Sequence, residues 1–368
     1  MTLSQEVKQA RKKVVTDGYE MSLGEIISLY KSDELVIDPA FQRLFRWDDE
    51  RKTKFIESLI LGIPIPPIFV YQDNEGVWEL IDGLQRLSTV LQLTGDLKGA
   101  SAINATPLVL NGTRFLPSLN GKRWVDSHPT AGDGLGSPLQ IEIKRARVRV
   151  EILKSDSDVS AKYELFQRLN TGGVGLTEQE VRNSIAISIN KNFYDWLVSR
   201  SEDPSFTEAT AQTTAALKSQ MGIELVLRFL AFRKIEYQPG LDVHEYLDNA
   251  LFELASDRDL DLGAEEAIFT QTFDYLNEAL GSNSFKRWNG QKFTGKFLMS
   301  LYEVIAVGVA SNIPQLSRLS SSRRKSAIVK AAKKLWDNDI FTENSGAGVR
   351  GTTRLSRLLP IAADAMRP

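Results

Sequence analysis

The stretch from Ile81 to Val90, Ile-Asp-Gly-Leu-Gln-Arg-Leu-Ser-Thr-Val, marks a change of hydrophobic period. Two strand-like runs, 67–71 and 77–81, precede the change, and a turn-forming Asn-Glu-Gly segment separates them. Beyond Gly83, apolar residues recur at helical spacing. The pattern therefore predicts that Asp82 and Gly83 join the end of a strand to the start of a helix.

A joint of this kind can bind anions. The first N–H groups of a helix lack backbone partners and favour negative charge. Gly83 has no Cβ to block a phosphate, while Gln85 and Arg86 place side-chain donors in the first turn. Taken alone, these residues leave two interpretations open: a phosphate site, or an ordinary strand–helix joint with a surface arginine.

Other motifs surround this joint in a fixed order. They are Phe41-Gln42-Arg43, Trp47, Ser58-Leu59, Gly62-Ile63-Pro64, Ile81 to Arg86, Phe166 to Gly173 and Leu176 to Asn183. With this set the chain resembles the DUF262 family, the ParB/sulfiredoxin-like domain found at the N-terminus of GmrSD-type restriction enzymes and of phosphorothioate-sensing SspE proteins. One position departs from the family pattern: Leu84 stands where the family has the first Gln of Gly-Gln-Gln-Arg.

The resemblance implies an α+β protein in two parts. A ParB/sulfiredoxin-like nucleotide-binding domain is expected at residues 1–155, followed by a mainly α-helical domain at 156–368. The implied ligand is a nucleoside triphosphate with Mg²⁺, and GTP or CTP is favoured over ATP.

The resemblance also implies roles for the residues at the joint. Arg86 would neutralise charge that develops during phosphoryl transfer, and Gln85 would orient the attacking water. Asp82 would either hold Mg²⁺ through water or position the attacking water. The remaining residues expected to bind nucleotide are Gln42, Arg43, Gly83, Ser88 and Asn170.

The implied setting is restriction of foreign DNA in bacterial defence against phage. Many relatives carry a C-terminal HNH nuclease domain, which needs histidines close together, whereas this sequence has only His128 and His244. We therefore expect an Mg²⁺-dependent NTPase that is not a nuclease on its own and acts with a separate effector protein. The alternative is a non-catalytic, antitoxin-like adaptor that binds DNA or protein. A sulfiredoxin-like reductase is disfavoured because that chemistry requires a cysteine, and there is none.

Composition adds limits but no function. There is no apolar run long enough for a membrane span and no signal-peptide core, and the absence of cysteine fits a cytoplasmic protein. A net charge of −2 gives no overall attraction to nucleic acid, so any DNA contact has to be local. The candidate is the basic run Arg323-Arg324-Lys325, for which a solvated helix face is the alternative. Homo-oligomerisation stays open.

The rest of the chain gives a coarse pattern of elements. Capping residues predict helix starts at Ser22 and at Asp48 or Asp49. Residues 107–110 and 113–116 are strand candidates, and 141–153 is predicted to be an exposed or edge strand. Helices are expected near 191–200, 213–234, 242–256, 264–281, 293–312, 322–337 and 353–365. Gly290 to Lys296 resembles a P-loop, but Phe297 stands where Ser or Thr is needed, so a loop is predicted there.

Overall fold

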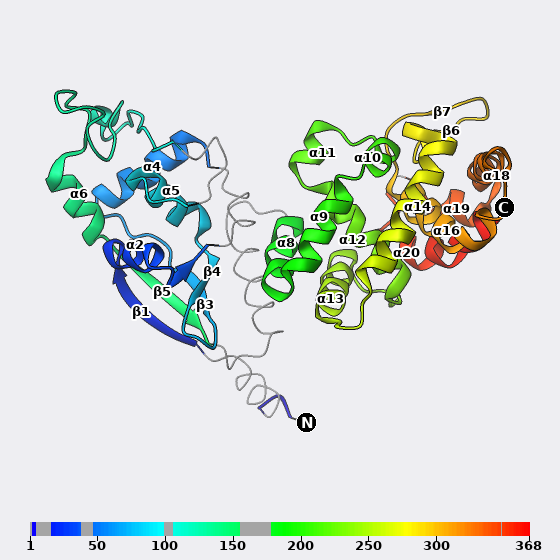
Figure 1. Cartoon of the computed structure of the whole chain (residues 1–368), viewed down its shortest axis with the longest axis horizontal. Coiled ribbons are helices and arrows are strands. Elements are labelled where there is room, and N and C mark those ends of the chain that lie inside the picture. Colours follow the sequence, from blue (N-terminus) through cyan, green and yellow to red (C-terminus); the bar gives the residue numbers. More distant parts are fainter. Residues whose placement is uncertain (1, 5–15, 38–46, 99–105, 155–177, 347) are drawn as a thin grey trace. The chain divides into compact units, whose positions relative to one another are not determined.

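The computed structural model describes residues 2–4, 16–37, 47–98, 106–154, 178–346 and 348–368. The chain divides into two compact units, Met1–Gly175 and Leu176–Pro368 (Figure 1). The predicted architecture is confirmed at the level of α+β: a mixed sheet with helices comes first and a mainly helical region follows. The expected domain boundary at 155/156 lies outside the described residues.

The N-terminal unit contains a five-stranded mixed sheet with strand order β1-β5-β3-β4-β2. Its strands are β1 (Thr16–Ser22), β2 (Leu35–Val36), β3 (Ile68–Gln72), β4 (Trp78–Asp82) and β5 (Arg147–Leu153). The β1–β5 and β3–β4 pairs are antiparallel, while the β3–β5 and β2–β4 pairs are parallel. The helical elements of this unit are α2 (Leu23–Lys31), α4 (Asp49–Ile60), α5 (Leu84–Thr94), the short turn η1 (Pro117–Leu119) and α6 (Gly136–Arg145).

Strand β5 shows how the sheet is covered. Val148, Val150 and Ile152 are buried, whereas Arg147 and Arg149 on the opposite face are exposed. In Figure 1 the helices of this unit lie on one side of the sheet. The prediction of an exposed or edge strand over 141–153 was wrong in two respects: 141–145 belongs to α6, and β5 lies between β1 and β3. The alternation reflected one open face of the sheet, and not an open edge.

The two predicted helix starts of this unit are confirmed. At α2, Glu25 N–H donates to the Ser22 hydroxyl at 3.2 Å, and Ser22 N–H donates to the Glu25 carboxylate at 2.8 Å. At α4, the Asp48 carboxylate accepts the N–H of Arg51 at 2.8 Å. The prediction of strands at 107–110 and 113–116 was wrong, because this segment is irregular. The alternating residues Leu108 and Leu110 are buried and anchor a loop in the core.

The C-terminal unit is mainly helical. Its helices are α8 (Glu178–Ile189), α9 (Lys191–Ser201), α10 (Pro204–Thr210), α11 (Thr214–Lys218), α12 (Met221–Lys234), α13 (Val243–Ser256), α14 (Leu262–Leu280), α15 (Met299–Leu301), α16 (Val307–Ser311), α17 (Ile313–Leu316), α18 (Ser321–Lys334), α19 (Asp339–Asn344), α20 (Gly351–Leu358) and α21 (Ala362–Ala365). Shorter turns are η2 (Gly281–Asn283), the π-helical η3 (Tyr302–Ala306), η4 (Leu335–Asp337) and η5 (Leu359–Ile361). No helix in the described part of the chain is long and apolar enough to cross a membrane.

A small β-hairpin interrupts these helices. Strands β6 (Arg287–Trp288) and β7 (Phe293–Thr294) pair antiparallel, and the Asn289 side chain accepts N–H groups from the turn. The helix expected over 293–312 therefore begins only at Met299. The P-loop-like segment 290–296 forms the turn of this hairpin, its second strand and the bend after it, so the predicted loop is confirmed except for the two residues of β7. The next helix begins at Met299, so no helix start follows the segment directly.

Buried charged side chains cross the core of the helical unit. Arg182 on α8 is fully buried, and its Nε donates to Asp248 on α13 at 2.7 Å. Glu224 on α12 lies 3.5 Å from Arg182 and pairs with Arg228 at 2.7 Å. Such groups are stable only when every charge has a partner, so this network links three helices.

Candidate functional site

The predicted joint at Asp82 and Gly83 is present in the structure. Strand β4 ends at Asp82, helix α5 begins at Leu84, and Gly83 is the N-cap residue with a φ of 106°. Because the N-cap residue is glycine, it supplies no side-chain cap to this helix start. The register of the β3–β4 pair shifts between Phe69 and Val70, opposite the end of β4, as in a β-bulge. The strand-to-helix prediction is therefore confirmed, and the uncapped helix start lies beside an irregular strand end.

Packing explains why residue 83 is a glycine. A Cβ there would lie 2.5 Å from Cγ2 of Ile68, on the neighbouring strand β3. The positive φ also strains any residue that has a Cβ. The contact with Ile68 and the positive φ both require a glycine even when no ligand is bound, so the glycine by itself is no evidence of phosphate binding.

Arg86 holds the joint together. Its Nη1 donates to the carbonyl oxygens of Pro66 and, at 3.0 Å, Pro67, and its Nη2 donates to Asp82 Oδ2 at 2.8 Å. The side chain is only 14% exposed, so Arg86 is not the surface arginine of the simpler interpretation. Burial lowers the pKa of Arg86, and the adjacent Asp82 carboxylate opposes this shift. Three of the five N–H donors of this arginine are thereby used.

Pro66 and Pro67 were not among the predicted site residues. They take part through backbone carbonyl groups, which side-chain patterns do not reveal. The one signal was the Pro-rich segment before β3, because a segment rich in proline forms few backbone pairs and leaves carbonyl oxygens available.

Gln85 connects two motifs that are distant in sequence. Its Oε1 accepts the backbone N–H of Trp47 at 3.0 Å, just before α4. The Trp47 ring packs edge-on against Phe55 of that helix, with 5.8 Å between ring centroids. The fold therefore brings the Trp47 motif to the first turn of α5. Leu84, where the family has Gln, is half-buried beside it.

The other predicted nucleotide-binding residues fall into two groups. Ser88 is fully buried in α5, and its hydroxyl has no hydrogen-bond partner in the part of the chain that the structure describes. Gln42, Arg43 and Asn170 lie outside the described residues.

Asp82 is the carboxylate at the joint that could hold a metal ion. No three Asp, Glu or His side chains converge on one point within the described ranges. Mg²⁺ in nucleotide sites is commonly held by one or two carboxylates, with phosphate oxygens and water completing the shell. Asp82, a single carboxylate next to the N-terminus of α5, is compatible with that pattern.

Comparison with protein families identifies the segment that contains this joint. Residues 23–187 match the family described as GmrSD restriction endonuclease, N-terminal domain. Residues 23–187 are a GmrSD N-terminal domain. The predicted resemblance to DUF262 is thereby confirmed, and domains of this family are parts of restriction-type defence enzymes. No curated protein matches the chain. The GmrSD match continues past Gly175 to include most of α8, the first helix of the second unit.

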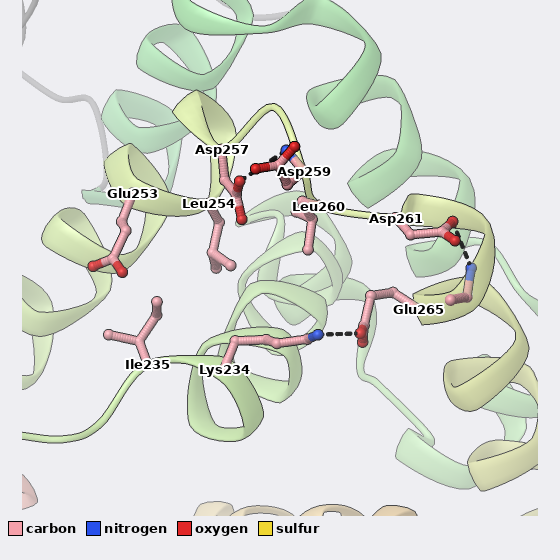
Figure 2. A pocket seen from close by; sticks show the side chains of 10 residues that line it. Lys234, Ile235, Glu253, Leu254, Asp257, Asp259, Leu260, Asp261 and Glu265 are labelled. Atoms are coloured by element: carbon pink, nitrogen blue, oxygen red, sulfur yellow. Dashed lines mark hydrogen bonds and ion pairs between the residues drawn. The ribbon is translucent and has the colours of Figure 1, made fainter.

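A hollow in the helical unit does not suit a nucleotide. It encloses about 270 Å³ between the ends of α12 and α13 and the start of α14 (Figure 2). Five acidic side chains line it, and Lys234 pairs with one of them, Glu265, at 2.7 Å. Asp261 is engaged in capping α14 through the N–H of Ala264. Carboxylates repel phosphate, and none of the predicted site residues lies there.

A second, open cleft of about 530 Å³ lies in the N-terminal unit. Its lining includes Glu20, Glu25, Glu34 and Trp78. Trp78 begins β4, whereas the joint follows the other end of that strand, so this cleft and the GmrSD joint are different places. Its acidic lining also disfavours phosphate.

The structure separates the three predicted DNA-binding residues. Arg323 is exposed on α18. Arg324 is mostly buried: it stacks 4.1 Å from the centre of the Tyr275 ring and pairs with Glu278 at 3.0 Å. Lys325 is exposed and lies 3.5 Å from the same carboxylate. Arg323 is therefore the residue of this run that remains available to a partner.

Glu278 should make the attachment of α18 sensitive to acid. Bonds from Ser321 and Arg324 lower its pKa from 4.5 to about 2. Because the pKa is depressed in the folded state, the stabilisation is complete above pH 4.5 and is lost as the pH falls toward 2. We expect urea unfolding of Glu278→Gln to change less than that of the wild-type protein between pH 5 and pH 3. Glu245→Gln, at an exposed position on α13, is the control; an unchanged pH dependence in Glu278→Gln would contradict this assignment.

Proposed function

We propose that the GmrSD N-terminal domain of this chain binds a nucleoside triphosphate with Mg²⁺ and hydrolyses it within a restriction-type defence system. The observation that supports this most is the β4–α5 joint, where an uncapped helix start, Arg86 and Asp82 lie together. The fold of this domain is proposed to be ParB/sulfiredoxin-like. GTP and CTP are the favoured nucleotides.

Each group at the joint has a role in this proposal. The N–H groups of the helix start and the backbone of Gly83 bind phosphate oxygens. In this proposal the two N–H groups of Arg86 without a bond in the described residues donate to the same phosphate group, and Asp82 holds Mg²⁺ or positions the attacking water. Gln85, anchored on the Trp47 N–H, orients that water through its amide group. Gln42, Arg43, Ser88 and Asn170 complete the proposed nucleotide site.

The proposal includes a separate effector protein that carries out the restriction step. A second candidate function is a non-catalytic adaptor that binds nucleotide, DNA or protein without turnover. It is favoured by the internal bonds of Arg86 and by Leu84 at the position of the family Gln. Release of inorganic phosphate distinguishes the two candidates.

Gln85→Glu tests the phosphate site with little risk to the fold. A carboxylate keeps an acceptor for the Trp47 N–H, and a negative charge in the first turn of a helix is itself stabilising. The same charge repels bound phosphates, so we expect nucleotide affinity to fall about 10- to 100-fold, which corresponds to about 1.4–2.8 kcal/mol. Calorimetric titration with GTP, CTP, ATP and UTP in Mg²⁺ measures this effect.

Gln72→Glu is the matched control, because it makes the same change in the same unit at the end of β3. Its affinity should equal that of the wild type. Equal affinities in Gln85→Glu and wild type would rule out a phosphate site at the joint. Tight binding in the wild type without phosphate release would support the adaptor.

A further inference from the structure

The C-terminal unit contains a segment with a strong excess of positive charge. Between residues 279 and 336 there are eleven basic residues and a single acidic one, Glu303, in a chain whose net charge is −2. Glu303 is fully buried and accepts two bonds from Arg354, at 2.7 and 3.0 Å. It therefore does not offset the positive charge at the surface.

Few of these cations are neutralised by neighbouring side chains. Arg324 and Lys325 contact Glu278. The other nine have no ion pair in the described part of the chain; they are Lys286, Arg287, Lys292, Lys296, Arg318, Arg323, Lys330, Lys333 and Lys334. Unpaired cations in such number indicate a surface suited to a polyanion.

The fold gathers two parts of this segment into one surface, formed by the β6–β7 hairpin and helix α18. The Lys333 ammonium lies 4.3 Å from the centre of the Trp288 ring in β6. The Arg287 guanidinium lies 5.4 Å from the centre of the Trp336 ring in η4, directly after α18. Two reciprocal cation–π contacts thus attach the hairpin to the helix. We call this combination the basic surface.

Helix α18 presents its charges as a row. Ile328, Ala331 and Ala332 are buried against the rest of the unit. Arg323, Lys330 and Lys334 are exposed, and their spacing of seven and four residues places them on one face of the helix. The row is about 16 Å long at 1.5 Å per residue.

We propose that the basic surface binds the phosphate backbone of double-stranded DNA without reading its sequence. A straight row of cations complements the regular phosphates of a duplex. Single-stranded nucleic acid is bound mainly by stacking of its bases on free aromatic faces. Here a cation of the protein covers one face of the Trp288 ring and one face of the Trp336 ring. These rings therefore serve to attach the hairpin to the helix and are poorly suited to stacking against bases.

The test uses the full chain with the double change Arg323→Glu and Lys330→Glu. Binding to a fluorescently labelled duplex of about 25 base pairs is measured by anisotropy from 50 to 200 mM salt, without nucleotide. We expect at least a tenfold loss of affinity at 50 mM salt. The negative slope of log affinity against log salt should become shallower by about 2, because each phosphate contact contributes about 1 to its magnitude. Both residues are exposed, so the fold should be retained, which circular dichroism checks.

The matched control is Lys191→Glu with Arg258→Glu. These residues are exposed on α9 and after α13, at the other end of the unit from α18 (Figure 1). The control changes the net charge equally and should alter affinity less than twofold. A second variant, Lys292→Glu with Lys296→Glu in and after the hairpin turn, should weaken binding as the α18 variant does.

Three results would overturn the proposal: no loss in the α18 variant, an equal loss in the control, or tighter binding to single-stranded RNA or phosphatidylserine vesicles than to the duplex. The inference is independent of the nucleotide site. Gln85→Glu should leave duplex affinity unchanged, so failure of one proposal can be told from failure of the other.

Discussion

Arg182→Met is expected to destabilise the helical unit by about 3–5 kcal/mol. Arg182 is fully buried; besides Asp248 and Glu224, it contacts Gln179 at 3.0 Å and the His244 ring at 2.9 Å. Methionine fills much of the volume but removes, in a poorly solvated place, the cation bonded to Asp248 and one of the two cations beside Glu224, which keeps Arg228. Removing one partner of a buried ion pair typically has this cost. Urea unfolding followed by circular dichroism measures it.

Lys191→Ala is the control for this prediction. Lys191 pairs with Asp195 at 2.6 Å, but both side chains are about half exposed, so the loss should stay below about 1 kcal/mol. Adding Asp248→Leu to Arg182→Met should cost less than the sum of the two single changes, because the two residues bond each other and each single change already removes that bond. A loss below about 1 kcal/mol in Arg182→Met would show that the network does not stabilise the unit.

Gly83→Ala should destabilise the N-terminal unit by about 2–5 kcal/mol. The left-handed backbone costs a residue with a Cβ about 1–2 kcal/mol. The clash with Ile68 at 2.5 Å adds about 1–3 kcal/mol, because β3 has to move or Ile68 has to change rotamer. Thermal and urea unfolding of the purified variant measure the effect.

Gly95→Ala provides a matched control at the other end of the same helix. Gly95 also has a positive φ, of 79°, but no atom lies within 4 Å of the position of its Cβ. We expect about 1–2 kcal/mol there, which is the backbone cost alone. Equal losses at the two glycines would show that contact with Ile68 does not constrain the joint.

The motif Leu176 to Asn183 acquires a structural role from the fold. Arg182 and Asn183 are both buried in the second unit, and Asn183 accepts a bond from Gln179 at 2.8 Å. The GmrSD match ends in this helix, so part of the family's sequence pattern serves the core of the helical unit. Patterns of residue type alone do not distinguish such a buried arginine from one that binds a ligand.

The sequence by itself determined the local features. The period change at Asp82 and Gly83 was sufficient to predict the strand-to-helix joint, and Ser22 and Asp48 were sufficient to predict two helix starts. The GmrSD motifs were sufficient to predict the family. Each of these patterns depends on neighbours within a few residues. The same local reasoning failed for 141–153, since alternation describes which face of a strand is open but not its place in the sheet.

Tertiary structure decided what the candidate residues contact. Arg86 bonds carbonyl groups about twenty positions away, Gln85 bonds the backbone of Trp47, and Lys333 covers the ring of Trp288. The availability of a cation depends on the acids and rings that the fold places beside it. Arg323 and Arg324 are neighbours in sequence, yet one is exposed and the other is held by Glu278, because successive residues of a helix point about 100° apart.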